Sequence, residues 1–109
     1  MSDFLLVLTN LPDANSAATL SATLVELGLA ACVTQLAPCT STYRWQGKIE
    51  TAAEVPLLIK TSSAGYAALE QAIRLAHPYQ LPEIIALPIV RGLPAYLAWL
   101  GLETQPHKE

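Results

Sequence analysis

The chain has 109 residues, the size of one ordinary domain; 52% of them are hydrophobic and only 14% are charged. This balance excludes an intrinsically disordered chain, and the low charge indicates that other chains cover part of the surface. The net charge is −3 and the six Lys and Arg residues are scattered, so no basic stripe is expected to bind a nucleic acid.

The apolar segments and the cysteines give expectations about the compartment. The longest apolar runs, such as residues 4–8, fall far short of the roughly 20 residues that span a bilayer, so we expect no membrane partner. Residues 1–3 lack the basic start of a signal peptide. Cys32 and Cys39 do not make a disulfide framework, which favours a reduced, cytoplasmic protein.

A strand and a helix are predicted first. Residues 4–9 form a short apolar run without alternation, which is typical of a strand buried on both faces. Asp13 is the expected N-cap of a helix, and Gly28 stands where a helix commonly ends. The helix is predicted from apolar residues at helical spacing: Ala17, Leu20, Leu24 and Leu27.

A long hairpin follows. Residues 31–45 and 48–61 predict two antiparallel strands joined by a two-residue turn at Gln46 and Gly47. Each arm has about 14 residues, or roughly 46 Å at 3.3 Å per residue, whereas a domain of this size has a radius of gyration near 13 Å. The hairpin is therefore expected to project beyond the domain.

Two prolines divide this hairpin. If Trp45 pairs with Lys48, Pro38 lies almost opposite Pro56, and proline cannot donate to a strand ladder. We therefore expect a bulge or an edge at this point. The half beyond the prolines needs a surface to lie against, because an isolated two-stranded ribbon is marginal in water; a second subunit is the expected surface.

The second half of the chain predicts a helix, a strand and a short final helix. Ser63 is the expected cap of a helix that Pro78 ends. Its apolar stripe consists of Tyr66, Leu69, Ile73 and Ala76. Residues 83–90 predict another strand that is apolar on both faces, and residues 92–102 predict the final helix.

This order indicates an α+β fold, a ferredoxin-like βαββαβ sandwich with a long hairpin between its second and third strands and a short C-terminal helix. We expect a single domain over residues 1–109, with a core of about 4–102 and a polar, frayed tail at 103–109. Two main helices cover one face of a four-stranded sheet. The other face should be buried by further copies of the chain in a closed assembly.

The sequence resembles the CutA family of divalent cation tolerance proteins over about residues 4–102. Separated motifs in the same order carry the resemblance: residues 29–33, 41–50, Glu54, 57–61, 77–85, Gly92, Tyr96, Leu97 and Trp99. The resemblance implies a homotrimer similar to PII signalling proteins, with hairpins wrapped around neighbouring subunits. It also implies a role in tolerance of copper or another divalent metal, by binding or sensing, without an established reaction.

The metal-ligand candidates are Cys32, Cys39, His77 and His107, none of which has the spacing of a dedicated zinc or copper motif. In some relatives the proposed copper ligands are a cysteine ending the first strand and a His-His pair before the proline. Here Thr9 and Ala76 occupy two of these positions and only His77 remains. Cys32 matches a family cysteine and is either a soft-metal ligand or a small buried hydrophobe. The role of Cys39 is open.

A second candidate site lies at the hairpin tip, where Tyr43, Trp45, Lys48 and Glu50 gather. These residues either pack at a subunit interface or form one wall of an inter-subunit cleft. His77, Tyr79 and Glu83 would form the opposite wall, and Lys60 would add a cation.

Such a cleft would suit a small anionic ligand or a metal, in a PII-like signalling or scaffold trimer. Gln80 replaces an acid that is usual in the family. The motifs of nucleophilic, phosphate-binding and metalloprotease sites are absent from the sequence, so we do not expect an enzyme.

Overall fold

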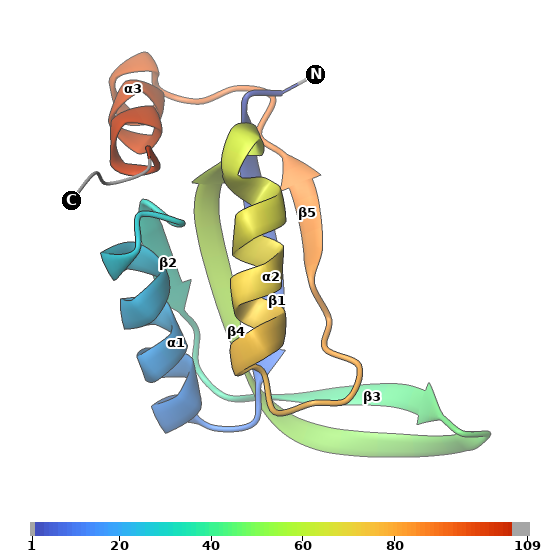
Figure 1. Ribbon diagram of the computed structural model, residues 1–109. Coiled ribbons are helices and arrows are strands. Elements are labelled where there is room, and N and C mark those ends of the chain that lie inside the picture. Colours follow the sequence, from blue (N-terminus) through green and yellow to red (C-terminus); the bar gives the residue numbers. More distant parts are fainter. Residues whose placement is uncertain (1, 106–109) are drawn as a thin grey trace.

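The structure is a computed structural model that describes residues 2–105 (Figure 1). Its elements in chain order are β1 (Phe4–Leu11), α1 (Ala14–Glu26), β2 (Cys32–Gln35), β3 (Cys39–Trp45), β4 (Lys48–Ser62), a 3-10 turn (Ser63–Gly65), α2 (Tyr66–Ala76), β5 (Ile85–Pro88) and α3 (Pro94–Glu103). β2 and β3 are two halves of one interrupted strand. The order is therefore the predicted βαββαβ arrangement with a terminal helix, and the ferredoxin-like α+β fold is confirmed.

All strand pairings in this sheet are antiparallel. The strand order is β2-β4-β1-β5, and β3 pairs with the remaining half of β4. α1 and α2 lie side by side across one face of the sheet (Figure 1). β4 is the longest element with 15 residues, and it carries both the body of the sheet and one arm of the projecting hairpin.

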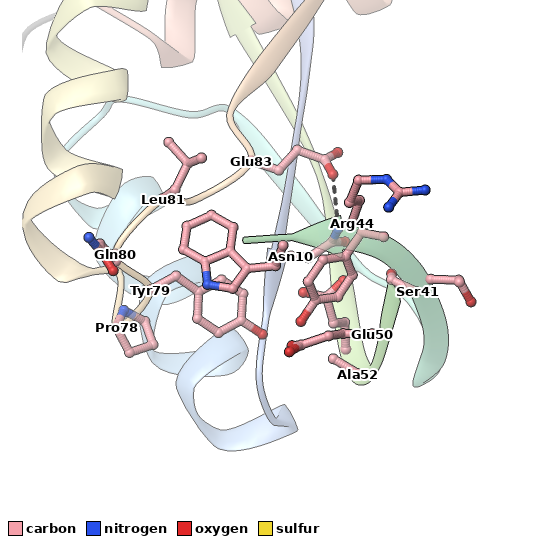
Figure 2. Close-up of a pocket in the computed structure, with 14 residues that line it drawn as sticks. Asn10, Ser41, Arg44, Glu50, Ala52, Pro78, Tyr79, Gln80, Leu81 and Glu83 are labelled. Atoms are coloured by element: carbon pink, nitrogen blue, oxygen red, sulfur yellow. Dashed lines mark hydrogen bonds between the residues drawn. The ribbon is translucent and has the colours of Figure 1, made fainter. Parts of the chain in front are cut away.

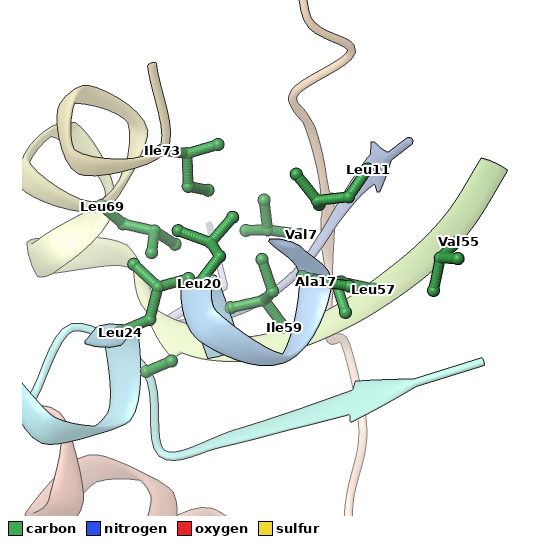
Figure 3. Packing of buried hydrophobic residues seen from close by; sticks show 11 residues of the cluster. Val7, Leu11, Ala17, Leu20, Leu24, Val55, Leu57, Ile59, Leu69 and Ile73 are labelled. Carbon is green, nitrogen blue, oxygen red and sulfur yellow. The ribbon is translucent and has the colours of Figure 1, made fainter. Parts of the chain in front are cut away.

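The core lies between α1, α2 and the sheet. Odd-numbered residues of β1 and of the second half of β4 point toward the helices, since side chains alternate between the faces of a strand. Helix residues at three- and four-residue spacing pack onto them. The cluster contains Val7, Leu11, Ala17, Leu20, Leu24, Val55, Leu57, Ile59, Leu69 and Ile73 (Figure 3).

The even-numbered residues of the same strands form the other face of the sheet, which we call the open face. The register places Leu8 beside both Leu58 and Ile85, and Leu6 beside Leu87. These side chains are only partly covered; Ile85 is 49% exposed and Leu87 is 45% exposed. The middle of the open face is therefore apolar, as the sequence predicted for the face without α1 and α2.

α3 covers one end of the open face. A Cβ placed on Gly101 would lie 3.5 Å from Cε1 of Phe4, an even-numbered residue of β1. Tyr96 of the same helix lies near Cys32. Leu100 is completely buried. The final helix thus shields the Phe4 and Cys32 end and leaves the Leu8, Leu58 and Ile85 region uncovered.

The hairpin has the predicted register and the predicted interruption. Trp45 pairs with Lys48, and the turn between them places both central residues in the left-handed region, with φ of 51° at Gln46 and 81° at Gly47. Such values are typical of a type I′ turn, whose twist matches that of the flanking strands. The ribbon of β3 and β4 extends well beyond the body of the molecule (Figure 1).

A bulge separates the two halves of this hairpin. Gln35 pairs with Leu57 and Cys39 pairs with Glu54, so three residues of one arm face two of the other. The three are Leu36, Ala37 and Pro38, and the two are Val55 and Pro56. The extra residue bends the ribbon away from the sheet, and the bulge predicted from the two prolines is confirmed.

The ends of the helices agree with the sequence at α1 and differ at α2. Asp13 caps α1 by accepting a 2.7 Å hydrogen bond from the backbone N–H of Ser16, and Gly28 has the expected positive φ of 73°. The prediction that Ser63 caps the second helix is wrong. Ser63 lies in the 3-10 turn and donates through its hydroxyl to the carbonyl of Ser2, so α2 begins at Tyr66 without a side-chain cap.

The bounds of several elements differ from the prediction; α3, for example, begins at Pro94 and not at Gly92. β1 continues to Leu11, because β4 pairs with it throughout, and β5 is limited to Ile85–Pro88. β5 pairs only with β1, and all four of its residues are exposed in one chain, so it is not a strand buried on both faces.

The C-terminal tail was predicted to begin at Glu103, and this starting point is wrong. Glu103 ends α3, and Thr104 is buried and donates to the carbonyl of Leu100; residues 106–109 lie outside the described residues.

Candidate functional site

A groove of about 890 Å³ lies between the projecting hairpin and the loop after α2 (Figure 2). The hairpin forms one wall and the loop at residues 78–83 forms the other. Its lining residues combine aromatic rings with charged groups: Asn10, Ser41, Thr42, Tyr43, Arg44, Trp45, Glu50, Ala52, Glu54, Pro78, Tyr79, Gln80, Leu81 and Glu83. This volume is within the range of small-molecule sites.

The register of β3 and β4 assembles the hairpin wall. Tyr43 pairs with Glu50, and Cys39 pairs with Glu54, so these side chains share one face of the ribbon. Trp45 occupies the same face two residues beyond Tyr43. Alternation along the two strands therefore places aromatic and acidic groups together without any motif that is contiguous in sequence.

The opposite wall is a loop whose shape its prolines restrict. Pro78 follows His77, the C-cap of α2, and forces it out of helical backbone, with ψ of 133°. At the other end of the loop, the side-chain amide of Asn10 donates a 3.3 Å hydrogen bond to Oε1 of Glu83 (Figure 2). The loop is thus attached to β1 on the side of the sheet from which the hairpin projects.

Glu54 is one of the groove residues that the sequence analysis did not single out as site residues. It is only 8% exposed, although its neighbours toward the hairpin tip are largely exposed. The Tyr79 hydroxyl lies close to its carboxylate, and burial together with this neighbouring carboxylate raises the pKa of Tyr79 to about 12. The sequence did contain one indication of this role. Glu54 is an even-numbered residue of β4, as Glu50 is, so it shares the face of Glu50, and it stands directly before the bulge.

The structure brings together five of the eight residues predicted for the cleft, and His77 is among the three that do not line it. Tyr43, Trp45, Glu50, Tyr79 and Glu83 all line the groove, which is already formed within one chain. Lys48 and Lys60 do not line it. Lys60 instead lies on the open face, where its ammonium group donates to the hydroxyl of Thr34 and lies 3.7 Å from Sγ of Cys32.

His77 lies behind the loop and is only 8% exposed. Its Nε2 lies 2.7 Å from the carbonyl oxygen of Asn10, to which it donates, and its Nδ1 accepts from the backbone N–H of Tyr79 at 3.2 Å. These partners select the neutral imidazole with its proton on Nε2. The Tyr79 ring also packs on the imidazole, with 4.7 Å between ring centroids. His77 therefore links the end of α2 to β1 and positions Tyr79.

Acid should weaken this link. The pKa of His77 lies below its ordinary value of 6.5, chiefly because burial disfavours the imidazolium ion. The unfolded chain therefore binds more protons below about pH 6.5 than the folded chain does. The stabilisation is complete above that pH and is lost as the pH falls through the folded pKa. Melting temperatures measured from pH 7.5 downward should show this loss.

The variant His77→Gln should reduce that pH dependence, with His107→Gln as the matched control for removing one imidazole. If the melting temperature of His77→Gln falls with acidification as steeply as that of the parent, His77 does not carry the effect.

The predicted metal ligands do not gather in one chain. Cys32 is level with Leu6 across the sheet, whereas His77 binds the carbonyl of Asn10, which is four positions or roughly 13 Å further along β1. Binding a metal through His77 would require the loss of one of its two hydrogen bonds. No group of three or more His, Cys, Asp or Glu side chains suited to a metal occurs within residues 2–105.

The surroundings of Cys32 and of Thr9 also disfavour a metal ion bound within a single chain. The Lys60 ammonium next to Cys32 would repel a divalent cation. Thr9, at the place of the cysteine proposed as a ligand in relatives, is almost completely buried, and its hydroxyl has no hydrogen-bond partner among the described residues. The donor set of one chain therefore does not fit a preformed metal centre, and the assignment of His77 and Cys32 as ligands stays a prediction.

None of the helices in residues 2–105 has the length and apolar character that crossing a membrane requires.

Curated relatives have sequences similar to this chain. It is 43% identical over 98 residues to the divalent-cation tolerance protein CutA of Thermus thermophilus, covering 90% of this chain and 95% of that protein. It is 50% identical over 78 residues to the protein CutA homolog of Xenopus laevis, covering 72% of this chain but 52% of the frog protein. The chain thus spans about half the length of that relative.

Solved structures share the fold. CutA from Xylella fastidiosa superposes with a TM-score of 0.92 at 49% identity, covering 95% of this chain and 100% of that chain. The periplasmic divalent cation tolerance protein CutA from Archaeoglobus fulgidus gives a TM-score of 0.90 at 33% identity, covering 94% and 99%. The family model of the CutA1 divalent ion tolerance protein matches residues 5–103. This chain therefore belongs to the CutA1 divalent ion tolerance family.

Proposed function

We propose that the chain forms a homotrimer in the cytoplasm and acts in tolerance of copper or another divalent metal, by binding or sensing the metal and without catalysis. Family membership supports the metal-related role, since the family is named for tolerance of divalent ions rather than for a reaction. The main support for the homotrimer is the open face, whose apolar side chains are left uncovered in a single chain.

The open face supports assembly because a lone chain would leave it in water. Leu8, Leu58 and Ile85 are neighbours on it, and α3 shields only its Phe4 end. Burial of apolar surface contributes about 25 cal/mol per Å², so covering these side chains favours association. The projecting ribbon of β3 and β4 offers a second contact, because in a closed ring of three copies each copy can bind the ribbon of its neighbour.

Metal binding in such an assembly would use donors from more than one copy. One chain does not bring His77 and Cys32 together, whereas a threefold axis repeats each donor three times. Cys32 is half-buried in one chain, and a thiolate is a ligand that Cu(I) favours. We therefore propose that Cu(I) contacts Cys32, since the Lys60 ammonium repels its single charge less than that of a divalent ion, and that His77 acts on the fold of the neighbouring loop.

Copper titration tests this assignment. Under reducing conditions Cys32→Ala is expected to weaken Cu(I) uptake by the assembled protein at least about tenfold, because it removes the soft ligand. Cys39→Ala is the matched control, since Cys39 is an exposed thiol on the hairpin. His77→Ala is expected to lower the melting temperature more than the copper affinity. Unchanged uptake in both Cys32→Ala and His77→Ala would remove these residues from metal binding.

A further inference from the structure

We propose that the groove between the hairpin and the 78–83 loop binds a small organic cation, an aliphatic amine with one or more protonated ammonium groups. This proposal goes beyond metal tolerance and does not depend on it, since the groove is formed by residues of one chain. It rests on three features of the lining: its charge, a buried carboxylate and its aromatic rings.

The charge of the lining is negative. Both walls contribute carboxylates, Glu50 and Glu54 from β4 and Glu83 from the loop, against the single guanidinium of Arg44. The two lysines predicted for the cleft, Lys48 and Lys60, lie outside it. An anionic ligand would therefore meet mainly repulsion, whereas ammonium groups would find acceptors on both sides.

Glu54 is the strongest of these acceptors. Its side chain lines the groove and is more than nine-tenths buried, and burying a carboxylate is costly unless a cation or several donors compensate it. The polar group that the chain brings close to it is the neutral hydroxyl of Tyr79. A bound ammonium group would provide the opposite charge and a charge-assisted hydrogen bond at this carboxylate.

The aromatic rings and the size of the groove favour an organic cation over a bare metal ion. Tyr43, Trp45 and Tyr79 line the same space, and the faces of such rings attract ammonium groups through cation–π contacts. The methylene groups of an aliphatic amine can pack on these rings while its charged ends reach the carboxylates. A volume of about 890 Å³ accommodates a small organic molecule.

Tryptophan fluorescence provides the test. The chain has two tryptophans, so Trp99→Phe in α3 leaves Trp45 as the only indole and as a reporter within the groove. Titration of the assembled Trp99→Phe protein with spermidine is expected to give a saturable fluorescence change that weakens as salt is raised. Citrate, an anion of similar size, is expected to give none.

Charge-removing variants in the same background identify the site. Glu54→Gln should weaken spermidine binding at least about tenfold, since a hydrogen bond to a charged partner is lost. Glu50→Gln should weaken it as well, and Glu50 is exposed, so the fold does not depend on it. Glu26→Gln at the exposed end of α1 removes the same charge outside the groove and should leave the affinity unchanged.

Four results would overturn the proposal: no saturable response to spermidine, an equal response to citrate, an equal loss in Glu26→Gln, or unchanged affinity in Glu54→Gln and Glu50→Gln. Copper titration and light scattering on the same samples separate this failure from that of the proposed function. Intact copper uptake and trimers without spermidine binding would overturn this inference alone.

Discussion

Ile85→Lys is expected to convert the assembled protein into monomers of 11.7 kDa, as measured by light scattering behind a sizing column. Ile85 lies on the open face beside Leu8, and it is 49% exposed in one chain, so a lysine there can extend into water without disturbing the monomer. In a trimer the same ammonium would be buried among apolar side chains in every copy. Burying unpaired charges costs several kcal/mol each, which exceeds what a small interface can supply.

The matched control is Leu75→Lys on α2. Leu75 is 81% exposed and lies on the helical side of the molecule, away from the open face, so the same change of charge should leave the assembly intact. A parent protein that is monomeric, or an Ile85→Lys variant that stays as assembled as the parent, would refute the trimer and the role given to the open face.

Leu69→Ala is expected to destabilise the fold by about 3 kcal/mol, within the roughly 2–5 kcal/mol typical of a fully buried leucine. Leu69 is completely buried and projects from α2 into the cluster around Ile59 and Leu24 (Figure 3). Truncation removes the transfer free energy of the side chain and leaves a cavity that rigid neighbours on the sheet cannot fill. Denaturant unfolding at one fixed protein concentration measures the loss, because assembly adds to the apparent stability.

Leu75→Ala in the same helix is the control for this measurement. It makes the same substitution at a position that is 81% exposed, and the change in the free energy of unfolding should stay within about 0.5 kcal/mol. Equal losses in the two variants would show that the effect comes from helix α2 itself rather than from packing against the sheet.

The sequence predicted part of the groove because strand alternation is a local property. Once Trp45 is placed opposite Lys48, Tyr43 and Glu50 must share a face, and the hairpin wall follows. The same alternation places Glu54 on the face of Tyr43 and Glu50, but alternation does not predict that Glu54 is buried. Glu54 is buried because the loop carrying Tyr79 lies against it, and that contact joins residues far apart in the chain.

His77 shows the limit of arguments from residue type. A histidine before a proline, in a chain that resembles metal tolerance proteins, was a reasonable ligand candidate. In the fold both of its ring nitrogens have backbone partners, Asn10 and Tyr79, and the first of these belongs to the distant strand β1. Hydrogen bonds between distant segments decide whether an imidazole is free to bind a metal, and spacing in the sequence does not reveal them.

The sequence alone was enough to predict the order of the elements, the Asp13 cap, the turn at Gln46 and Gly47, and the bulge between the prolines, because each follows from local backbone preferences. It also determined that the sheet has more apolar surface than α1 and α2 cover. The folded structure was needed to show where α3 lies, which lysines stay outside the groove and which carboxylate is buried in it. These features depend on contacts between segments far apart in the chain, which local preferences do not specify.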